Sequence, residues 1–157
     1  MKFSTRSDVD APIGHVFDQV TDFASFERAA MRRGAKVRRV DTQDLRGPGM
    51  CWEASFPFRG KTREFQIDLE DYEAPTHLAA AAKSSGVSVF CDVELIELSP
   101  RKTRMRISID VKPKTLSARV LVQSMKLAKG TIERRFSARV ADYAKDLSEG
   151  YAKAARA

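Results

Sequence analysis

Cysteine is scarce in this sequence. Its 157 residues include two cysteines, Cys51 and Cys91, and neither belongs to a CxxC pair or to a cluster with histidine. Zinc sites and the disulfide frameworks of small secreted domains need several such residues at close spacing. The sequence therefore predicts two free, buried thiols and no metal site.

Histidine is equally scarce, because His15 and His77 are the only two in the chain. No HExxH, GxSxG or glycine-rich phosphate loop accompanies them. General acid–base catalysis needs a positioned partner, and the spacing offers none to either histidine. We therefore expect surface or capping histidines, no catalytic residue and no cofactor.

Long apolar runs are lacking as well. The longest run of small apolar residues covers residues 78–82, whereas a helix that crosses a bilayer takes about 20 apolar residues. The first eight residues contain no apolar core of a signal peptide. These features predict a cytoplasmic protein.

Positive charge is in excess, since the net charge of the chain is +7. The one dense basic run lies at residues 32–39, and acidic residues intersperse most of the other lysines and arginines. A basic cluster can bind phosphates, so an interaction module for RNA, the ribosome or an anionic membrane is one hypothesis. The scattering favours a solvated surface, so no nucleic acid is expected as a partner, and transient membrane contact and the oligomeric state stay open.

The length and the composition suit one globular domain over residues 1–157, since 43% of the residues are hydrophobic and 31% are charged. Residues 2–9 alternate between apolar and polar side chains, which predicts a strand. Pro12 then opens a short helix, and residues 25–33 form a second helix that ends at Gly34.

Strand patterns fill the middle of the chain. Alternating apolar residues predict five antiparallel strands with one apolar face, at residues 50–58, 62–69, 75–82, 87–95 and 104–111, with a turn at residues 59–61 after the first. Past Pro113 the apolar residues recur in steps of three and four. This spacing predicts one helix of about 40 residues, roughly 60 Å long, with a bend or break near Gly130.

Several short motifs carry a resemblance to a known family. They are Val9-Asp10-Ala11-Pro12 with Val16-Phe17, Val20-Thr21-Asp22-Phe23, Gly47-Pro48-Gly49 before Trp52, Pro75-Thr76-His77-Leu78, and Leu98-Ser99-Pro100 before Thr103. In this order they resemble the START-like (SRPBCC) superfamily, in its polyketide cyclase/dehydrase and lipid-transport branch. The segment after Asp22 carries Phe23 and Phe26 where a tryptophan is usual in that branch.

The resemblance implies an α+β helix-grip fold. A curved antiparallel sheet of about six to seven strands would wrap around the long C-terminal helix, with two short helices after the first strand. The concave face would enclose an apolar cavity that holds a lipid, a quinone or a polyketide-like molecule. The residues expected to line this cavity are Trp52, Phe56, Arg63, Phe65, Ile67, Val89, Met105 and Ile107 on strands, and Leu121, Met125 and Ile132 on the helix.

Binding or transport of a small hydrophobic ligand, without catalysis, is therefore the leading hypothesis. Arg63 is in phase with the apolar residues of its strand, so its guanidinium could anchor a carboxylate or head group, although a strand-end residue that reaches solvent is the favoured explanation. The enzymatic alternative is a polyketide cyclase or dehydratase. That chemistry needs a polar group deep in the cavity, for which His77 and Arg63 are the candidates.

Overall fold

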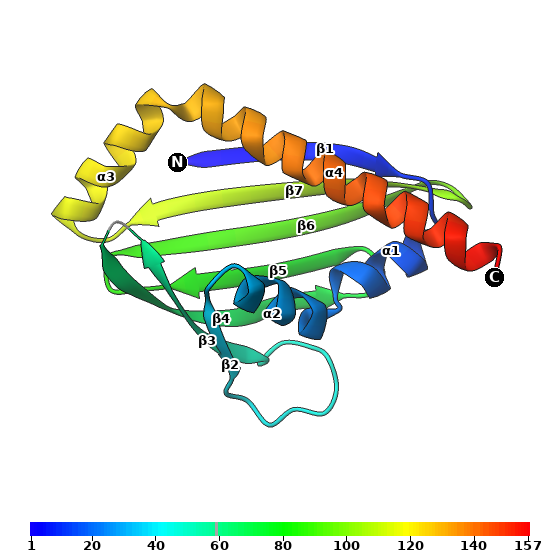
Figure 1. The fold of residues 1–157 in the computed structure, drawn as a ribbon, viewed down its shortest axis with the longest axis horizontal. Coiled ribbons are helices and arrows are strands. Elements are labelled where there is room, and N and C mark those ends of the chain that lie inside the picture. Colours follow the sequence, from blue (N-terminus) through cyan, green and yellow to red (C-terminus); the bar gives the residue numbers. More distant parts are fainter. Residues whose placement is uncertain (59) are drawn as a thin grey trace.

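In a computed structural model that describes residues 1–58 and 60–157, seven antiparallel strands form one curved sheet with helices on its concave side (Figure 1). The elements in chain order are β1 (Lys2–Val9), α1 (Ile13–Val20), α2 (Phe23–Arg32), β2 (Lys36–Arg39), β3 (Cys51–Phe58), β4 (Lys61–Glu73), β5 (His77–Lys83), β6 (Val87–Ser99), β7 (Lys102–Pro113), α3 (Leu116–Leu127) and α4 (Lys129–Ala155). The helix-grip architecture predicted from the sequence is confirmed. The predicted turn at residues 59–61 includes residue 59, which lies outside the described residues.

The strands follow the order β1-β7-β6-β5-β4-β3-β2 across the sheet. Strands β2 to β7 lie side by side in chain order. Strand β1 forms the far edge of the sheet and pairs along its whole length with β7. Side chains alternate between the two faces of a strand, and directly paired residues share a face. The register therefore decides which residues line the concave face under the helices.

Local signals explain the first two helices. Pro12 precedes α1 in extended conformation, with a φ of −62° and a ψ of 149°. Asp22 caps α2, because its side chain accepts a hydrogen bond from the backbone nitrogen of Ser25 at 3.3 Å. Gly34 follows α2 with a φ of +95°, a conformation that glycine adopts without strain. The sequence predicted both helices, with α2 beginning two residues before the predicted start.

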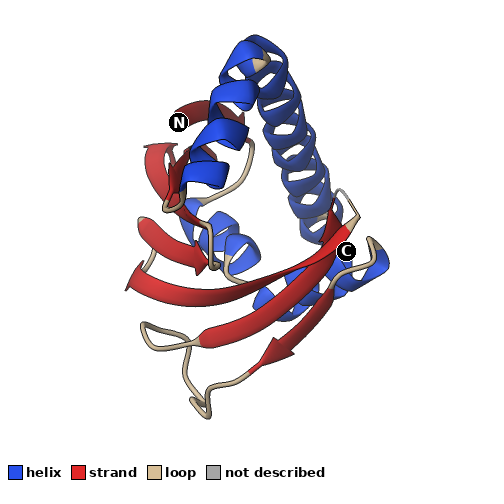
Figure 2. Cartoon of the chain, turned by 90° about the vertical axis from the view of Figure 1, so that its left-hand side faces the viewer, coloured by secondary structure: helices blue, strands red, loops and turns tan. Residues whose placement is uncertain are grey.

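The C-terminal helix is not continuous. It breaks at Ala128, whose φ of −105° and ψ of 17° end α3 and begin α4. Helix α3 packs against β7, whereas α4 packs against β1, and one straight helix cannot follow both directions (Figures 1 and 2). The helical stretch of about 40 residues predicted from the periodicity is thus divided into two helices, and the bend or break predicted near Gly130 is a break two residues before that glycine.

Two features of the sheet go beyond the sequence prediction. The short strand β2, whose residues read as part of a basic run, pairs with β3 and forms the edge of the sheet. In β4 a bulge between Leu69 and Asp71 shifts the register against β5. Beyond the bulge Tyr72 points into the core, where its ring contacts Phe17 edge-on at 5.2 Å, and Asp71 points to the opposite face.

The core fills one half of the concave side, below the middle and C-terminal part of α4. We call this region the closed half. Its buried apolar side chains are Val9, Ala11, Val16, Phe17, Val20, Met50, Trp52, Leu69, Leu78, Val93, Leu95, Met105, Val140, Ala144 and Leu147. Among the described residues, no helix is both long enough and apolar enough to traverse a membrane.

The closed half contains one buried polar link between distant parts of the chain. Thr103 on β7 is 0% exposed, and its hydroxyl donates to the carbonyl oxygen of Ala11 at 2.9 Å. Replacing Thr103 with valine keeps the shape but leaves the Ala11 carbonyl without this donor. We predict that Thr103→Val lowers the free energy of unfolding by about 1–3 kcal/mol, measured by urea denaturation.

The control for this prediction is Thr62→Val, at an exposed strand position of β4. Its free energy of unfolding should change by less than about 0.5 kcal/mol. Equal effects of the two substitutions would contradict a stabilising role for the Thr103 hydrogen bond.

Candidate functional site

The concave face holds every strand residue that the sequence assigned to a ligand site. Direct pairs in the register connect Trp52 with Ile67 and Phe56 with Arg63, and alternation along β4 adds Phe65. The other three, Val89, Met105 and Ile107, share this face through their pairs with Ala82, Leu95 and Val93. The fold thus brings these eight residues onto one surface.

This surface is not covered evenly. Met105 and Trp52 belong to the closed half, where they are 0% and 6% exposed. Ile67 and Ile107 lie at its border, half-buried and packed against the core. Further along the same strands the burial decreases, and Phe65 and Val89 are only half-buried.

We call the less covered part of the concave face the open half. Its strand residues are apolar, apart from Lys61 and Arg63, and each is half-buried or exposed: Phe56, Lys61, Arg63, Phe65, Val87, Val89, Ile109 and Val111. Ala80 and Ala82 lie on the same face of β5, and their methyl groups fill little of the space above the sheet. The open half therefore presents apolar surface that the side chains of this protein do not fully cover.

The helical residues predicted for the site lie above the open half. Leu121 and Met125 come from α3 and Ile132 from the first turn of α4, and all three are half-buried. Figure 2 shows α3 and the start of α4 on the side of the sheet that carries the concave face. The structure therefore brings these three residues and the strand residues to one side of the sheet.

Arg63 is the half-buried charged residue of the open half, whereas Lys61, two residues before it on the same face of β4, is exposed. The Nε atom of Arg63 is buried, and no hydrogen-bond acceptor contacts it among the described residues. The cross-strand neighbour Phe56 stacks on Phe65, with ring centroids 5.5 Å apart and planes at 6°. Two aromatic rings and an arginine with an unused donor thus lie next to one another.

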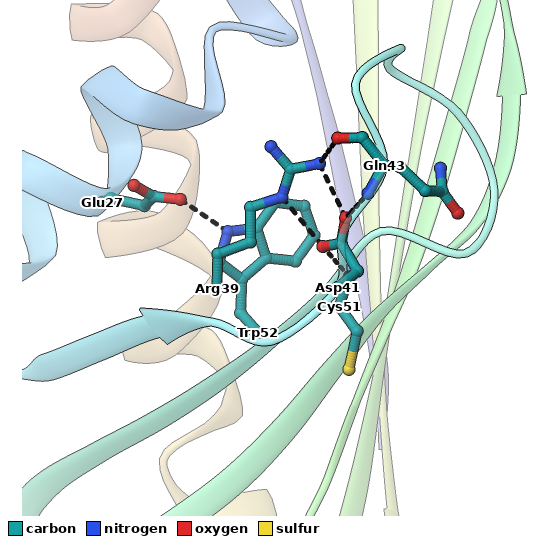
Figure 3. A network of polar contacts seen from close by, with 6 residues as sticks. All are labelled: Glu27, Arg39, Asp41, Gln43, Cys51 and Trp52. Carbon is teal, nitrogen blue, oxygen red and sulfur yellow. Dashed lines mark hydrogen bonds and ion pairs between the residues drawn. The ribbon is translucent and has the colours of Figure 1, made fainter.

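The sheet edge beside Trp52 is fixed by a polar network (Figure 3). The indole nitrogen of Trp52 donates to Glu27 of α2 at 2.6 Å. Next to it Arg39 donates to both oxygens of Asp41, at 2.8 and 2.7 Å. This arginine, with backbone donors from Cys51 and Gln43, holds the pKa of Asp41 well below its usual value.

The network also bears on the basic run at residues 32–39. Arg39 is occupied by Asp41, and Arg38 forms an ion pair with Glu53 at 2.6 Å. Two of the charges that the interaction-module hypothesis needs are therefore already neutralised within the chain.

Hollows in the molecular surface do not match the enclosed apolar cavity that the resemblance implies. One of about 650 Å³ lies over β2 to β5, lined mostly by residues that point away from the helices: Lys36, Val37, Arg38, Glu53, Ala54, Ser55, Glu64, Phe65, Gln66, Lys83, Ser84 and Ser85. Another, of about 680 Å³, lies between β1 and α4. Both hollows are bordered by charged side chains, so the enclosed cavity stays a prediction.

His77 has two partners that sequence spacing did not reveal. Its Nδ1 lies 2.7 Å from Asp71 and its Nε2 lies 2.8 Å from Asp92. The hydrogen bond to Asp92 is the main cause that raises the pKa of His77, with Asp71 adding to it against the effect of burial. The bulge in β4 turns Asp71 to this face, and Asp92 comes from β6, so neither contact was visible in a local pattern.

Both histidines lie away from the open half. His77 pairs with Glu73 and Glu94 on the convex face, while its neighbour Leu78 points into the core. His15 lies on α1, where its ring contacts Tyr151 edge-on at 4.9 Å. His77 therefore does not supply the deep polar group that the enzymatic alternative requires.

The cysteines are free, as predicted. They are half-buried rather than buried, and they lie on opposite faces of the sheet: Cys51 beside Asp68 on the convex face and Cys91 beside Ile109 on the concave face. Burial raises the pKa of both thiols to about 11, with Asp68 contributing for Cys51. Both thiols are therefore protonated at neutral pH.

Solved structures share this fold. The aromatase/cyclase ZhuI from Streptomyces sp. R1128 matches with a TM-score of 0.64 at 12% identity, over 92% of this chain and 93% of its own. The protein TTHA0849 from Thermus thermophilus has a TM-score of 0.68 at 8% identity, over 96% of this chain and 99% of its own. A START superfamily protein from Mycobacterium smegmatis has a TM-score of 0.55 at 13% identity, over 85% and 95%.

These likenesses confirm a START-like (SRPBCC) fold. At 8–13% sequence identity these similarities support the fold alone. No protein-family model matches the sequence, and no curated protein matches it significantly.

The contacts of His77 with Asp71 and Asp92 predict that the stability of the protein depends on pH. Because the folded pKa lies above the unfolded value, the stabilisation is complete below about pH 6.5 and is lost as the pH rises through the folded pKa. We predict that His77→Gln lowers the free energy of unfolding more at about pH 6 than at about pH 9. Urea denaturation at both values measures this difference.

Asp92→Asn supplies the control for this prediction. In that background the extra cost of His77→Gln at the lower pH should shrink, because the main partner of the imidazolium is gone. A cost that does not vary with pH, or that persists unchanged with Asp92→Asn, would contradict the assignment.

Proposed function

We propose that this protein binds a small, mainly apolar ligand that carries an acidic group, between the open half of the sheet and the helices α3 and α4. The observation that carries the proposal is the incompletely covered apolar surface around Arg63. It supports a binding function more directly than the fold does, because one fold hosts many functions.

The apolar part of the ligand follows from the burial pattern. On β4, β6 and β7 the concave-face residues within the core are buried, whereas those of the open half are half-buried, although they are apolar apart from Arg63 and the exposed Lys61 at the start of β4. Apolar surface left in contact with water costs about 25 cal/mol per Å², and ligand sites are typically concave and mostly apolar. A small hydrophobic molecule would cover this surface.

The acidic group follows from Arg63. A buried donor without an acceptor costs about 1–3 kcal/mol, and more for a charged group. A carboxylate or a similar anion supplies the acceptor and the opposite charge together, in the planar geometry that guanidinium matches. The stacked rings of Phe56 and Phe65 next to Arg63 suit an aromatic or polyene body.

The likeness to a protein named aromatase/cyclase keeps polyketide-like molecules within this proposal, beside lipids and quinones. Binding is favoured over catalysis because neither histidine faces the open half. Tyr143, which contacts Phe26 on the helical side, has its pKa raised to about 12 by burial and stays protonated at neutral pH. General acid–base chemistry would need a group that titrates nearer to neutrality.

Arg63 can be tested with two fluorescent probes that differ in charge. Anilinonaphthalene sulfonate is anionic, and N-phenylnaphthylamine is uncharged and of similar size. We predict that Arg63→Met weakens binding of the sulfonate by about tenfold and changes binding of the neutral probe by less than about twofold. Fluorescence titration measures both affinities.

The control variant is Arg106→Met, which removes an exposed arginine from the convex face. It should leave both affinities unchanged. Equal loss of both probes with Arg63→Met would mean that the arginine is structural, and no binding of either probe to the unmodified protein would overturn the proposed function.

A second test asks whether the space above the open half, beside Ile132, is filled by side chains. Ile132 is half-buried and does not belong to the side chains that pack against the closed half, whereas Val140, two turns later on α4, is 6% exposed within it. Enlarging a side chain in a packed core costs about 1–3 kcal/mol. We predict that Ile132→Phe changes the free energy of unfolding by less than about 1 kcal/mol and that Val140→Phe lowers it by about 1–3 kcal/mol.

The added ring of Ile132→Phe should also occupy ligand space, so binding of N-phenylnaphthylamine should weaken at least about fivefold. Trp52, the single tryptophan of the chain, provides an independent fluorescence signal. A loss of more than about 2 kcal/mol for Ile132→Phe, without a change in probe binding, would show that Ile132 is ordinary core.

A further inference from the structure

Helix α3 is apolar on two faces. Leu121, Val122 and Met125 face the interior, where Val122 is 5% exposed. On the outside Leu116, Val120 and Leu127 are 78%, 61% and 92% exposed. Positions four and seven residues apart lie on one side of a helix, so these three side chains form a continuous outward stripe. We call it the α3 stripe.

The segment that contains the α3 stripe is rich in basic residues. Residues 112–139 contain eight lysines and arginines and one acidic residue, Glu133: Lys112, Lys114, Arg119, Lys126, Lys129, Arg134, Arg135 and Arg139. Lys112 pairs with Asp110 at 3.8 Å and Lys129 with Glu133 at 3.7 Å. Among the described residues the other six have no carboxylate partner. Arg119 and Lys126, seven residues apart, flank the stripe along one edge.

We propose that the α3 stripe and its flanking cations dock onto the surface of an anionic lipid membrane. The three aliphatic side chains would enter the boundary between headgroups and acyl chains, while the lysines and arginines contact the acidic headgroups. Their long apolar stems allow the charges to stay in the headgroup layer. An exposed apolar stripe beside unpaired cations is the combination that interfacial helices use.

Two other occupants fit the surface less well. A second copy of this chain would bring Arg119 and Lys126 near their own symmetry mates, and three aliphatic side chains fall far short of the ~800 Å² per partner of a stable interface. Single-stranded RNA binds through stacking on exposed aromatic rings, and the α3 stripe carries none. Neither occupant explains why the leucines are exposed to solvent beside the cations.

The docking surface lies beside the open half, at the end of the molecule that faces the viewer in Figure 2. Helix α3 contributes Leu121 and Met125 to the concave side from its inner face. Docking would therefore bring the open half close to the bilayer, where apolar molecules are dissolved. Membrane docking is inferred from the exposed apolar side chains of the α3 stripe and from the cations near it. It therefore does not depend on what the open half binds.

Flotation with phospholipid vesicles tests the proposal. The full chain should float with phosphatidylcholine vesicles that contain phosphatidylserine, weakly with phosphatidylcholine alone, and less as the salt concentration rises. The double variant Leu116→Ser/Leu127→Ser should bind at least about tenfold more weakly. Arg119→Gln/Lys126→Gln should lose about tenfold at low salt. All these positions are exposed, and circular dichroism verifies that each variant is folded.

Matched controls replace the same residue types elsewhere. Leu45→Ser removes a leucine that is 83% exposed between β2 and β3, and Arg32→Gln/Lys36→Gln removes two exposed charges of the basic run. Both should bind vesicles as the unmodified protein does.

Several results would overturn the proposal. They are failure to float with the acidic vesicles, equal losses in the control variants, and vesicle binding that depends on the cations but not on Leu116 and Leu127. The last result would indicate a general polyanion site, for which RNA binding unchanged by the leucine variant is the direct sign. A dimer that dissociates in the leucine variant, without vesicle binding, would assign the stripe to self-association.

Discussion

Pairing of the first strand with the last is the interaction on which the rest of this structure depends. All of β1 pairs with β7, more than 90 residues away in the chain. The pairing fixes the turn after β1 below α4, where the backbone nitrogen of Asp10 donates to Ser148 at 2.9 Å and the Ala11 carbonyl accepts from Thr103. It also gives α4 the strand on which to pack, so the sheet acquires a covered concave face.

The lengths of the elements then decide where the core ends. Helix α4 has 27 residues and is about 40 Å long, and its middle and C-terminal part supply Val140, Ala144 and Leu147 to the closed half. At Ala128 the chain changes direction, and α3 continues toward β7. Beneath this bend the apolar residues of the sheet are half-buried or exposed, and α3 contributes one buried side chain, Val122, which leaves the open half. A binding surface here is the consequence of a sheet that extends beyond the core sealed by its helix.

Much of the fold could be predicted from residue period and turn chemistry. The alternation that placed Phe56, Arg63 and Phe65 on one face is a property of each strand alone, so it held in the structure. Contacts that depend on register were missed, because Asp71 and Asp92 reach His77 only through a bulge and a neighbouring strand. How far each predicted site residue is covered also could not be predicted, since Met105 and Phe65 read alike in sequence but differ in burial.

By itself the sequence determined the periods of the strands and helices, the start of α1 after Pro12 and the end of α2 before Gly34, the faces that are apolar and the excess of positive charge. These are properties of residues close together in the chain, where steric preference and hydrogen-bonding capacity act directly. Only the tertiary structure decided that the last helix breaks at Ala128, that Arg63 has a buried nitrogen without a partner and that the leucines of α3 face water. The physical reason is that the burial of a side chain depends on all the elements packed around it. These elements come from distant parts of the chain, so no local sequence pattern includes them.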